Sequence, residues 1–126
     1  YTLWHTLSLH DALPISWALK HGKGDCSEHM CLFVALCRAA GIPARGVGGY
    51  VCETDRLLGP NGYHNWAQFY VDGTWNLADP QAKRFLKNRN YIAMRIIEGF
   101  TEKNANRFHR FKVIGETMEA KMKIWK

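Results

Sequence analysis

The sequence lacks several features that would place it in a familiar class. No stretch approaches the ~18 consecutive apolar residues of a membrane-spanning helix, so no membrane partner is expected. The four cysteines form no C-x-x-C pair, which argues against a disulfide framework and a zinc site. Reduced thiols favour a cytoplasmic setting without fixing the compartment. No Gly-rich phosphate loop, aromatic RNA-binding motif or helix-turn-helix pattern is present, and no cofactor is expected.

The length and charge of the chain suggest one domain with an uneven charge distribution. At 126 residues it can form a single core. Residues 1–80 carry five Lys/Arg and seven Asp/Glu (−2), whereas residues 81–126 carry twelve and four (+8). The basic part suits either an acidic partner such as nucleic acid or a solvated basic sheet face, and the missing motifs favour the solvated face. The oligomeric state is not indicated.

The first sixteen residues differ in character from the rest. Residues 6–15, TLSLHDALPI, resemble the translation of a sequencing-library adapter. The segment has no basic n-region, and His10, Asp11 and Pro14 interrupt its apolar residues, which excludes a secretory signal peptide. We therefore expect residues 1–16 to be non-native and an N-terminally truncated domain to occupy residues 17–126.

A long apolar run from Ser27 to Ala40 predicts a helix. The run is apolar on nearly every side, which predicts a central, buried helix. Either Asp25 or Cys26 is expected at the N-cap, while Gly41 and then Pro43 would end the helix. Cys26 therefore lies in the first turn, where unpaired N–H groups and the helix dipole stabilise a thiolate and can hold an oxyanion. The other cysteines, Cys31, Cys37 and Cys52, lie in apolar runs and are expected to be inert.

The stretch YHNWAQFYVDGTWNLADP, residues 63–80, predicts a β-hairpin. Strand-forming residues flank Asp72-Gly73, a strong two-residue turn signal. With Val71 opposite Thr74, Trp66 faces Asp79, and alternation places His64 and Asp79 on one face of the sheet. As diagonal neighbours ~7–8 Å apart, they lie within side-chain reach. Asp79 could then orient His64 as the base for the Cys26 thiol.

Other residues near this face are candidates for secondary roles. Trp66 and Gln68 share the face of His64 and are candidates for substrate binding or oxyanion contact. Trp17 is the aromatic candidate upstream of the cysteine, with core packing as its alternative role. A metal site formed by Cys26 and His29 with His21 or His64 is a weaker alternative, because no second matched ligand pair accompanies C-x-x-H.

Three blocks in this sequence resemble the core of the transglutaminase-like superfamily. They are a cysteine opening an apolar helix that ends in RAAGIPAR, a histidine in H-x-W, and an aspartate in W-x-x-x-D-P, together spanning roughly residues 22–81. The resemblance implies an α+β, papain-like fold in which the cysteine helix packs on an antiparallel sheet. It also implies that Cys26 is the nucleophile, His64 the base and Asp79 the orienting residue.

The remaining residues are expected to form the scaffold. We predict strands at 44–52 and 91–97, a loop at 53–62 that forms the rim of the cleft, and a hairpin from strands 108–114 and 117–125. In the first of these strands, Gly46, Gly48 and Gly49 should permit a bend or close backbone approach.

The functional expectation is thiol-dependent acyl transfer or hydrolysis on protein or peptide amides. Cross-linking, deamidation and proteolysis all fit this chemistry, and the sequence does not choose among them. The alternative from another class is a non-catalytic protein-binding module on the same fold, which the basic C-terminal part would suit.

Overall fold

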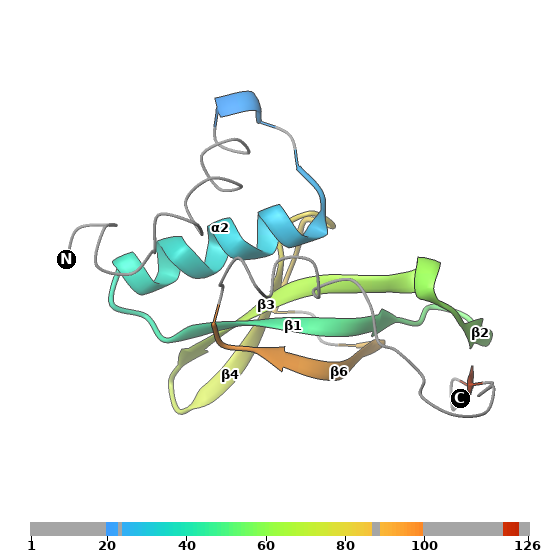
Figure 1. The fold of residues 1–126 in the computed structure, drawn as a ribbon. Helices are drawn as coiled ribbons and strands as arrows, with labels where there is room; N and C mark the ends of the chain where they lie inside the picture. The colour runs from blue at the N-terminus through green and yellow to red at the C-terminus, as the bar shows by residue number, and fades with distance from the viewer. Residues whose placement is uncertain (1–19, 23, 87–88, 100–119, 124–126) are drawn as a thin grey trace.

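A helix lies on one face of an antiparallel sheet in the computed structural model, which describes residues 20–22, 24–86, 89–99 and 120–123 (Figure 1). The helix is α2 (Cys26–Ala39). The sheet has the order β5-β4-β3-β1-β6. Its strands in chain order are β1 (Ala44–Val51), β3 (Tyr63–Val71), β4 (Thr74–Asp79), β5 (Arg84–Phe85) and β6 (Tyr91–Ile97). The α+β class expected from the sequence is therefore present.

The ends of α2 follow the local chemistry of the chain. Asp25 is the N-cap, and its side chain accepts hydrogen bonds from the backbone N–H groups of Ser27 and Glu28. Glu28 in turn accepts from the Asp25 N–H, which completes a capping box. At the other end Gly41 has φ 78°, a left-handed conformation that stops the helix. The predicted helix is confirmed, and of the two N-cap candidates, Asp25 and Cys26, the structure has Asp25.

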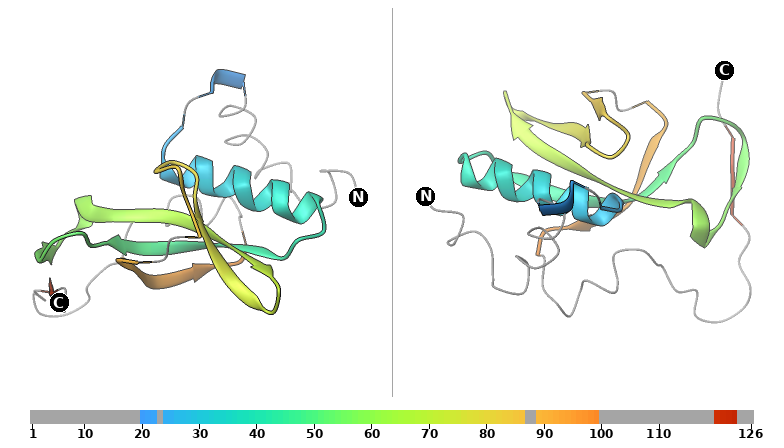
Figure 2. Two further views of the ribbon diagram at one scale, coloured as in Figure 1. Left: turned by 180° about the vertical axis from the view of Figure 1, so that it is seen from behind. Right: turned by 90° about the horizontal axis from the view of Figure 1, so that it is seen from above.

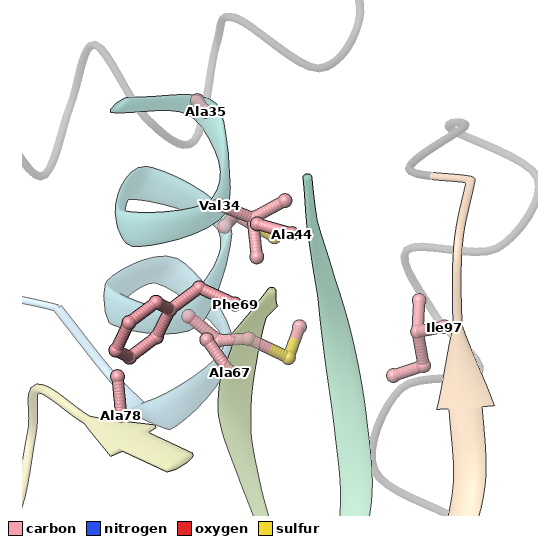
Figure 3. Close-up of a cluster of buried hydrophobic side chains, with 9 residues drawn as sticks. Val34, Ala35, Ala44, Ala67, Phe69, Ala78 and Ile97 are labelled. Carbon is pink, nitrogen blue, oxygen red and sulfur yellow. The ribbon is translucent and has the colours of Figure 1, made fainter. Parts of the chain in front are cut away.

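One side of α2 forms the main core with the sheet (Figures 2 and 3). Met30 and Val34 are fully buried against small and aromatic side chains of the strands, among them Ala67 and Phe69. The opposite side of the helix is different, since Leu36 is 51% exposed. The prediction that α2 is buried all round is therefore wrong. In the described part of the chain, α2 is fully packed only on the side toward the sheet, although its other side is also apolar in composition.

The β3–β4 hairpin has the predicted register. Asp72 and Gly73 have φ 54° and 77°, as a two-residue turn with two left-handed residues requires. The pairs run from Val71 opposite Thr74 to Ala67 opposite Ala78. Side chains on one face, such as Ala67, contact α2, and alternation sends the side chain of Trp66 to the other face.

The central strand β1 joins β3 and β6 and depends on glycine where its neighbours approach. It occupies all but the last residue of the predicted 44–52 strand, and β6 has the predicted bounds. A Cβ on Gly49 would overlap the carbonyl oxygen of Ile92 in β6. The register of this pair shifts between Gly48 and Gly49. The expectation of close backbone approach is confirmed at Gly49.

The predicted rim loop is more ordered than expected. Residues 53–62 contain strand β2 (Arg56–Leu58) and a 3-10 turn (Pro60–Gly62), and β2 pairs with β7 (Ala120–Met122). The loop assignment was wrong there, because backbone pairing with a distant strand overrides the local Gly-Pro-Asn-Gly signal. The predicted hairpin at 108–125, apart from β7, lies outside the described residues, as do residues 1–16 and Trp17. In the described part of the chain no helix is long and apolar enough to cross a membrane.

Candidate active site

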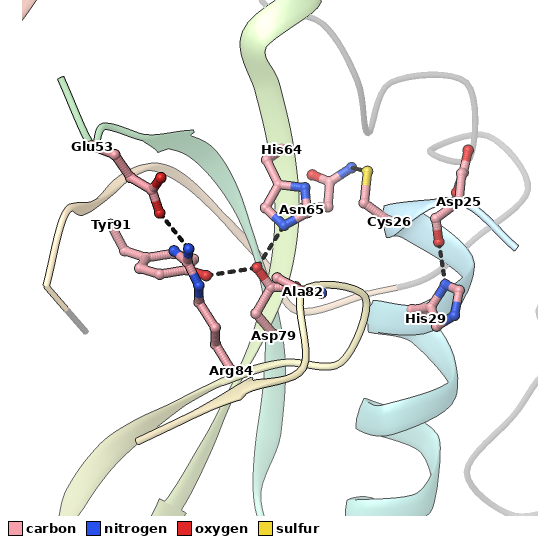
Figure 4. Close-up of polar contacts among 10 residues, drawn as sticks. All are labelled: Asp25, Cys26, His29, Glu53, His64, Asn65, Asp79, Ala82, Arg84 and Tyr91. Atoms are coloured by element: carbon pink, nitrogen blue, oxygen red, sulfur yellow. Dashed lines mark hydrogen bonds and ion pairs between the residues drawn. The ribbon is translucent and has the colours of Figure 1, made fainter. Parts of the chain in front are cut away.

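The thiol of Cys26 lies at the first residue of α2, where the helix begins beside β3 (Figure 4). The amide of Asn65, on β3, donates to the Ser27 hydroxyl at 2.9 Å and lies 3.8 Å from the Cys26 sulfur. Asn65 is buried and Cys26 is partly exposed. The helix start is thus fixed to the sheet by a buried amide that also touches the sulfur.

His64 and Asp79 form a close polar pair on the neighbouring strands β3 and β4. Nε2 of His64 donates to Oδ2 of Asp79 at 2.7 Å. The Asp79 side chain is fully buried, whereas the His64 side chain is 20% exposed. In Figure 4 the imidazole lies between Asp79 and Cys26. The hairpin register therefore brings these side chains together as the sequence predicted.

Asp79 accepts two further hydrogen bonds. The Tyr91 hydroxyl donates to Oδ2 at 2.8 Å, so one carboxylate oxygen serves both Tyr91 and His64. The backbone N–H of Ala82 donates to Oδ1 at 3.2 Å. Three donors around a fully buried carboxylate hold it in one orientation, which in turn fixes the plane and direction of the His64 ring.

The thiol and the imidazole perturb each other's ionisation. Burial raises the pKa of Cys26, but hydrogen bonds with the His64 side chain and the Asn65 backbone, and the His64 charge, bring this pKa below its ordinary value. Burial lowers the pKa of His64, but the hydrogen bonds to Asp79 and Cys26 and their negative charges raise it to about 9. Both shifts favour a thiolate beside an imidazolium at neutral pH.

The ionisation of Asp79 follows from its donors. Burial opposes a charged carboxylate, yet the hydrogen bonds from His64 and Tyr91 lower the pKa of Asp79 overall. Conversely, burial and the hydrogen bond to Asp79 raise the pKa of Tyr91 to about 12. Tyr91 therefore stays a neutral donor, and Asp79 stays a charged acceptor, over the whole physiological range.

The helix start offers fewer free N–H groups than the sequence suggested. The Ser27 and Glu28 N–H groups already donate to Oδ1 of Asp25. The Cys26 N–H makes no hydrogen bond with another described residue. Among the described residues, the Cys26 N–H is thus the backbone donor of the first turn that a developing oxyanion could use.

The other predicted site residues lie at different places. Trp66 is 1% exposed and lies near-parallel to His64, with ring centroids 6.2 Å apart, so it is buried beside the imidazole. The Gln68 side chain accepts from Arg45 at 3.0 Å and contacts neither His64 nor Cys26 in any described hydrogen bond. Trp17 lies outside the described residues.

The described residues do not assemble the metal site considered as an alternative. The His29 ring hydrogen-bonds to the Asp25 carbonyl at 2.8 Å. Within the described ranges no three His, Cys, Asp or Glu side chains group as metal ligands.

Sequence reasoning missed two polar residues of the site. Asn65 is adjacent to His64 in the chain but points to the opposite face of β3, toward α2, and the alternation rule offered a signal for it. Tyr91 comes from β6, which two other strands, β3 and β1, separate from β4 in the sheet. No local pattern in the sequence indicates a contact across that distance.

Comparison with known proteins gives one match. The sequence model of the family described as "Transglutaminase-like superfamily" matches residues 5–80. The matched segment includes Cys26, His64 and Asp79. No curated protein and no solved structure matches the chain significantly. A match over more than half of the chain, together with a helix on an antiparallel sheet, means that the chain belongs to the transglutaminase-like superfamily.

Proposed function

We propose that this protein is a cysteine acyltransferase or hydrolase that acts on amides of proteins or peptides through Cys26, His64 and Asp79. One observation carries the proposal. The thiol at the start of α2 shares a site with an imidazole whose other nitrogen is held by a buried carboxylate. Thiol acyl transfer requires a nucleophile beside a base, and an orienting group on the far side of that base. We propose in addition that the arrangement of the site is papain-like.

The proposed reaction proceeds in two steps that conserve atoms and charge. The Cys26 thiolate attacks the amide carbon and forms a C–S bond, and the oxyanion is met by the Cys26 N–H. The C–N bond then breaks as His64 gives its proton to the leaving nitrogen, which departs as an amine. In the second step water, or a second amine, loses a proton to His64 and attacks the thioester. The C–S bond then breaks, and the products are an acid or a new amide together with the regenerated Cys26 thiolate beside the protonated His64.

The proposal predicts different effects for substitutions of Asp79 and of Cys26. Asp79 acts through His64, by holding the correct orientation and tautomer of its ring, so Asp79→Asn should leave a weaker enzyme. Loss of Cys26 should abolish covalent chemistry and leave the fold nearly unchanged, because a first-turn thiol contributes little to the core.

The direct test is mass spectrometry of the protein incubated with a peptide library, with and without a primary amine. Hydrolysis of backbone amides would indicate a peptidase. Loss of ammonia from glutamine side chains would indicate deamidation, and amine incorporation would indicate transamidation. Activity that Cys26→Ala retains would contradict the proposal. A wild-type protein that forms no acyl-enzyme and is inert to thiol reagents would favour a non-catalytic binding module instead.

A further inference from the structure

A cavity of about 340 Å³ opens beside His64 and Asp79. Its wall includes Glu53, Arg56, Gly62, Arg84 and Tyr91. Neither Cys26 nor Asn65 lines it, and in Figure 4 Glu53, Arg84 and Tyr91 lie on the side of His64 away from the thiol. The cavity is therefore separate from the sulfur but shares the imidazole with the proposed reaction centre.

Among the described residues, the charges around this cavity form two pairs and leave one cation outside them. Arg84 forms an ion pair with Glu53, and His64 pairs with Asp79. Arg56 also lines the cavity, yet its guanidinium makes no ion pair or hydrogen bond with another described residue. Among the described charged groups of the wall, Arg56 is thus the cation that could pair with an anion from outside.

The backbone holds Arg56 in this place. A Cβ on Gly62 would overlap the Arg56 guanidinium, so the absence of a side chain there makes the room that Arg56 occupies. Arg56 also belongs to β2, whose pairing with β7 fixes its backbone. Arg56 is a partly buried residue, and its planar guanidinium is suited to bidentate recognition of a carboxylate.

The direction of the proposed reaction says which part of the substrate would reach this cavity. His64 must approach the leaving nitrogen to protonate it, so the amine component lies at the imidazole while the acyl component stays on the sulfur. A substrate that continues beyond its leaving nitrogen, on the side of His64 away from the thiol, enters the space lined by Arg56.

We propose that the cavity is a subsite for a carboxylate carried by the amine component of the substrate, bound by Arg56. This inference rests on the proposed function and narrows its substrate class to amides whose leaving amine is anionic. The carboxylate could be the C-terminal group of a peptide or an acidic side chain, and the experiment distinguishes the two.

The test compares three matched peptide series over the same acyl sequences. One ends in glycine carboxylate, one in glycine amide, and one in aspartate with an amidated C-terminus. We expect kcat/KM for an anionic series to exceed that of the glycine amides by roughly tenfold or more, the usual scale for a charge-assisted hydrogen bond. The anionic series with the higher value identifies the source of the carboxylate.

Arg56→Gln should remove the preference for the anionic series, mainly by raising its KM. Arg45→Gln, which loses the same charge outside the cavity wall, should keep it.

Gly62→Ala supplies a second variant, because it displaces the guanidinium without removing it, and it should weaken the preference as Arg56→Gln does. Equal turnover of all three series, or a preference that survives in Arg56→Gln, would overturn the inference. If wild type cleaves none of these peptides, peptide hydrolysis fails as the reaction, the glutamine assays above decide the rest of the proposed function, and binding decides the subsite separately. Acetyl-alanyl-glycine and its amide would then be titrated into Cys26→Ala by calorimetry. Tighter binding of the carboxylate, lost with Arg56→Gln, supports the subsite, whereas equal or undetectable binding refutes it.

Discussion

Replacing His64 with glutamine should slow alkylation of Cys26 sharply at neutral pH. The imidazolium is the main group that offsets the cost of burying the thiolate, and glutamine removes its charge. The burial remains, so the pKa of Cys26 should return to its ordinary range or above it. A thiol with the ordinary pKa of ~8.5 is only about 3% ionised at pH 7. We therefore expect the alkylation rate at pH 7 to fall by roughly tenfold or more.

The pKa of His64 determines the upper pH limit of the same ion pair. Its pKa of about 9, against an ordinary 6.5, corresponds to roughly 3 kcal/mol in favour of the imidazolium. The ion pair should therefore persist through neutral pH and disappear as pH rises through about 9. Turnover should follow a bell-shaped curve whose limbs belong to the coupled pair.

The assay is the rate of iodoacetamide alkylation from pH 5 to 10, read by mass spectrometry of the Cys26 peptide. His29→Gln is the matched control, because His29 is also in the first turn of α2 but bonds to the Asp25 carbonyl. That control should keep the wild-type profile. If wild type and His64→Gln both titrate with the pKa of a free thiol, no ion pair exists and the proposed mechanism fails.

Three further predictions concern other parts of the molecule. Tyr91→Phe should lower the free energy of unfolding by about 1–3 kcal/mol at pH 7, because Asp79 loses a hydrogen-bond donor. The difference in stability between wild type and variant should shrink below pH ~4 as the Asp79 carboxyl protonates. Urea unfolding of both proteins at pH 7 and at pH 3 measures these two effects. Gly49→Ala should lower the free energy of unfolding by about 1–3 kcal/mol, because the added Cβ meets the Ile92 carbonyl oxygen. Gly59→Ala is the control, because a Cβ at this position has open space around it, and it should leave the urea midpoint nearly unchanged. Limiting iodoacetamide should label Cys26 before Cys37, whose pKa burial raises, and faster labelling of Cys37 would contradict the assignment of Cys26.

The predictable part of the site depends on short-range signals. Asp25 and Gly41 mark the ends of α2 because a cap and a left-handed residue act within one turn of the chain. The Asp72-Gly73 turn fixes the register of β3 and β4, and with it the approach of His64 to Asp79. In each case the interacting residues are close in sequence, so the local pattern contains the needed geometry.

The unpredicted part depends on how distant strands are ordered. The local sequence predicts a loop around Arg56, and it contains no sign of the pairing with β7, since that strand is more than sixty positions away. Tyr91 reaches Asp79 only because β6 lies beside β1 and β1 beside β3. Likewise, the exposed side of α2 could not be distinguished from its packed side by an apolar pattern that runs around the whole helix.

These long-range contacts also surround the carboxylate that would orient His64 in the proposed reaction. The family match ends at residue 80, immediately after Asp79, yet two groups that surround this carboxylate lie beyond it. Ala82 donates to one oxygen, and Tyr91 shares the other with His64. Arg84, paired with Asp79 in the sheet register, also interacts with the Tyr91 side chain. The proposed nucleophile and base thus lie in the matched segment, while the strength with which Asp79 holds the imidazole depends on the strands that follow it. Members of the superfamily that differ in those strands should therefore differ in the pH range of the thiolate–imidazolium pair, even with the same Cys, His and Asp.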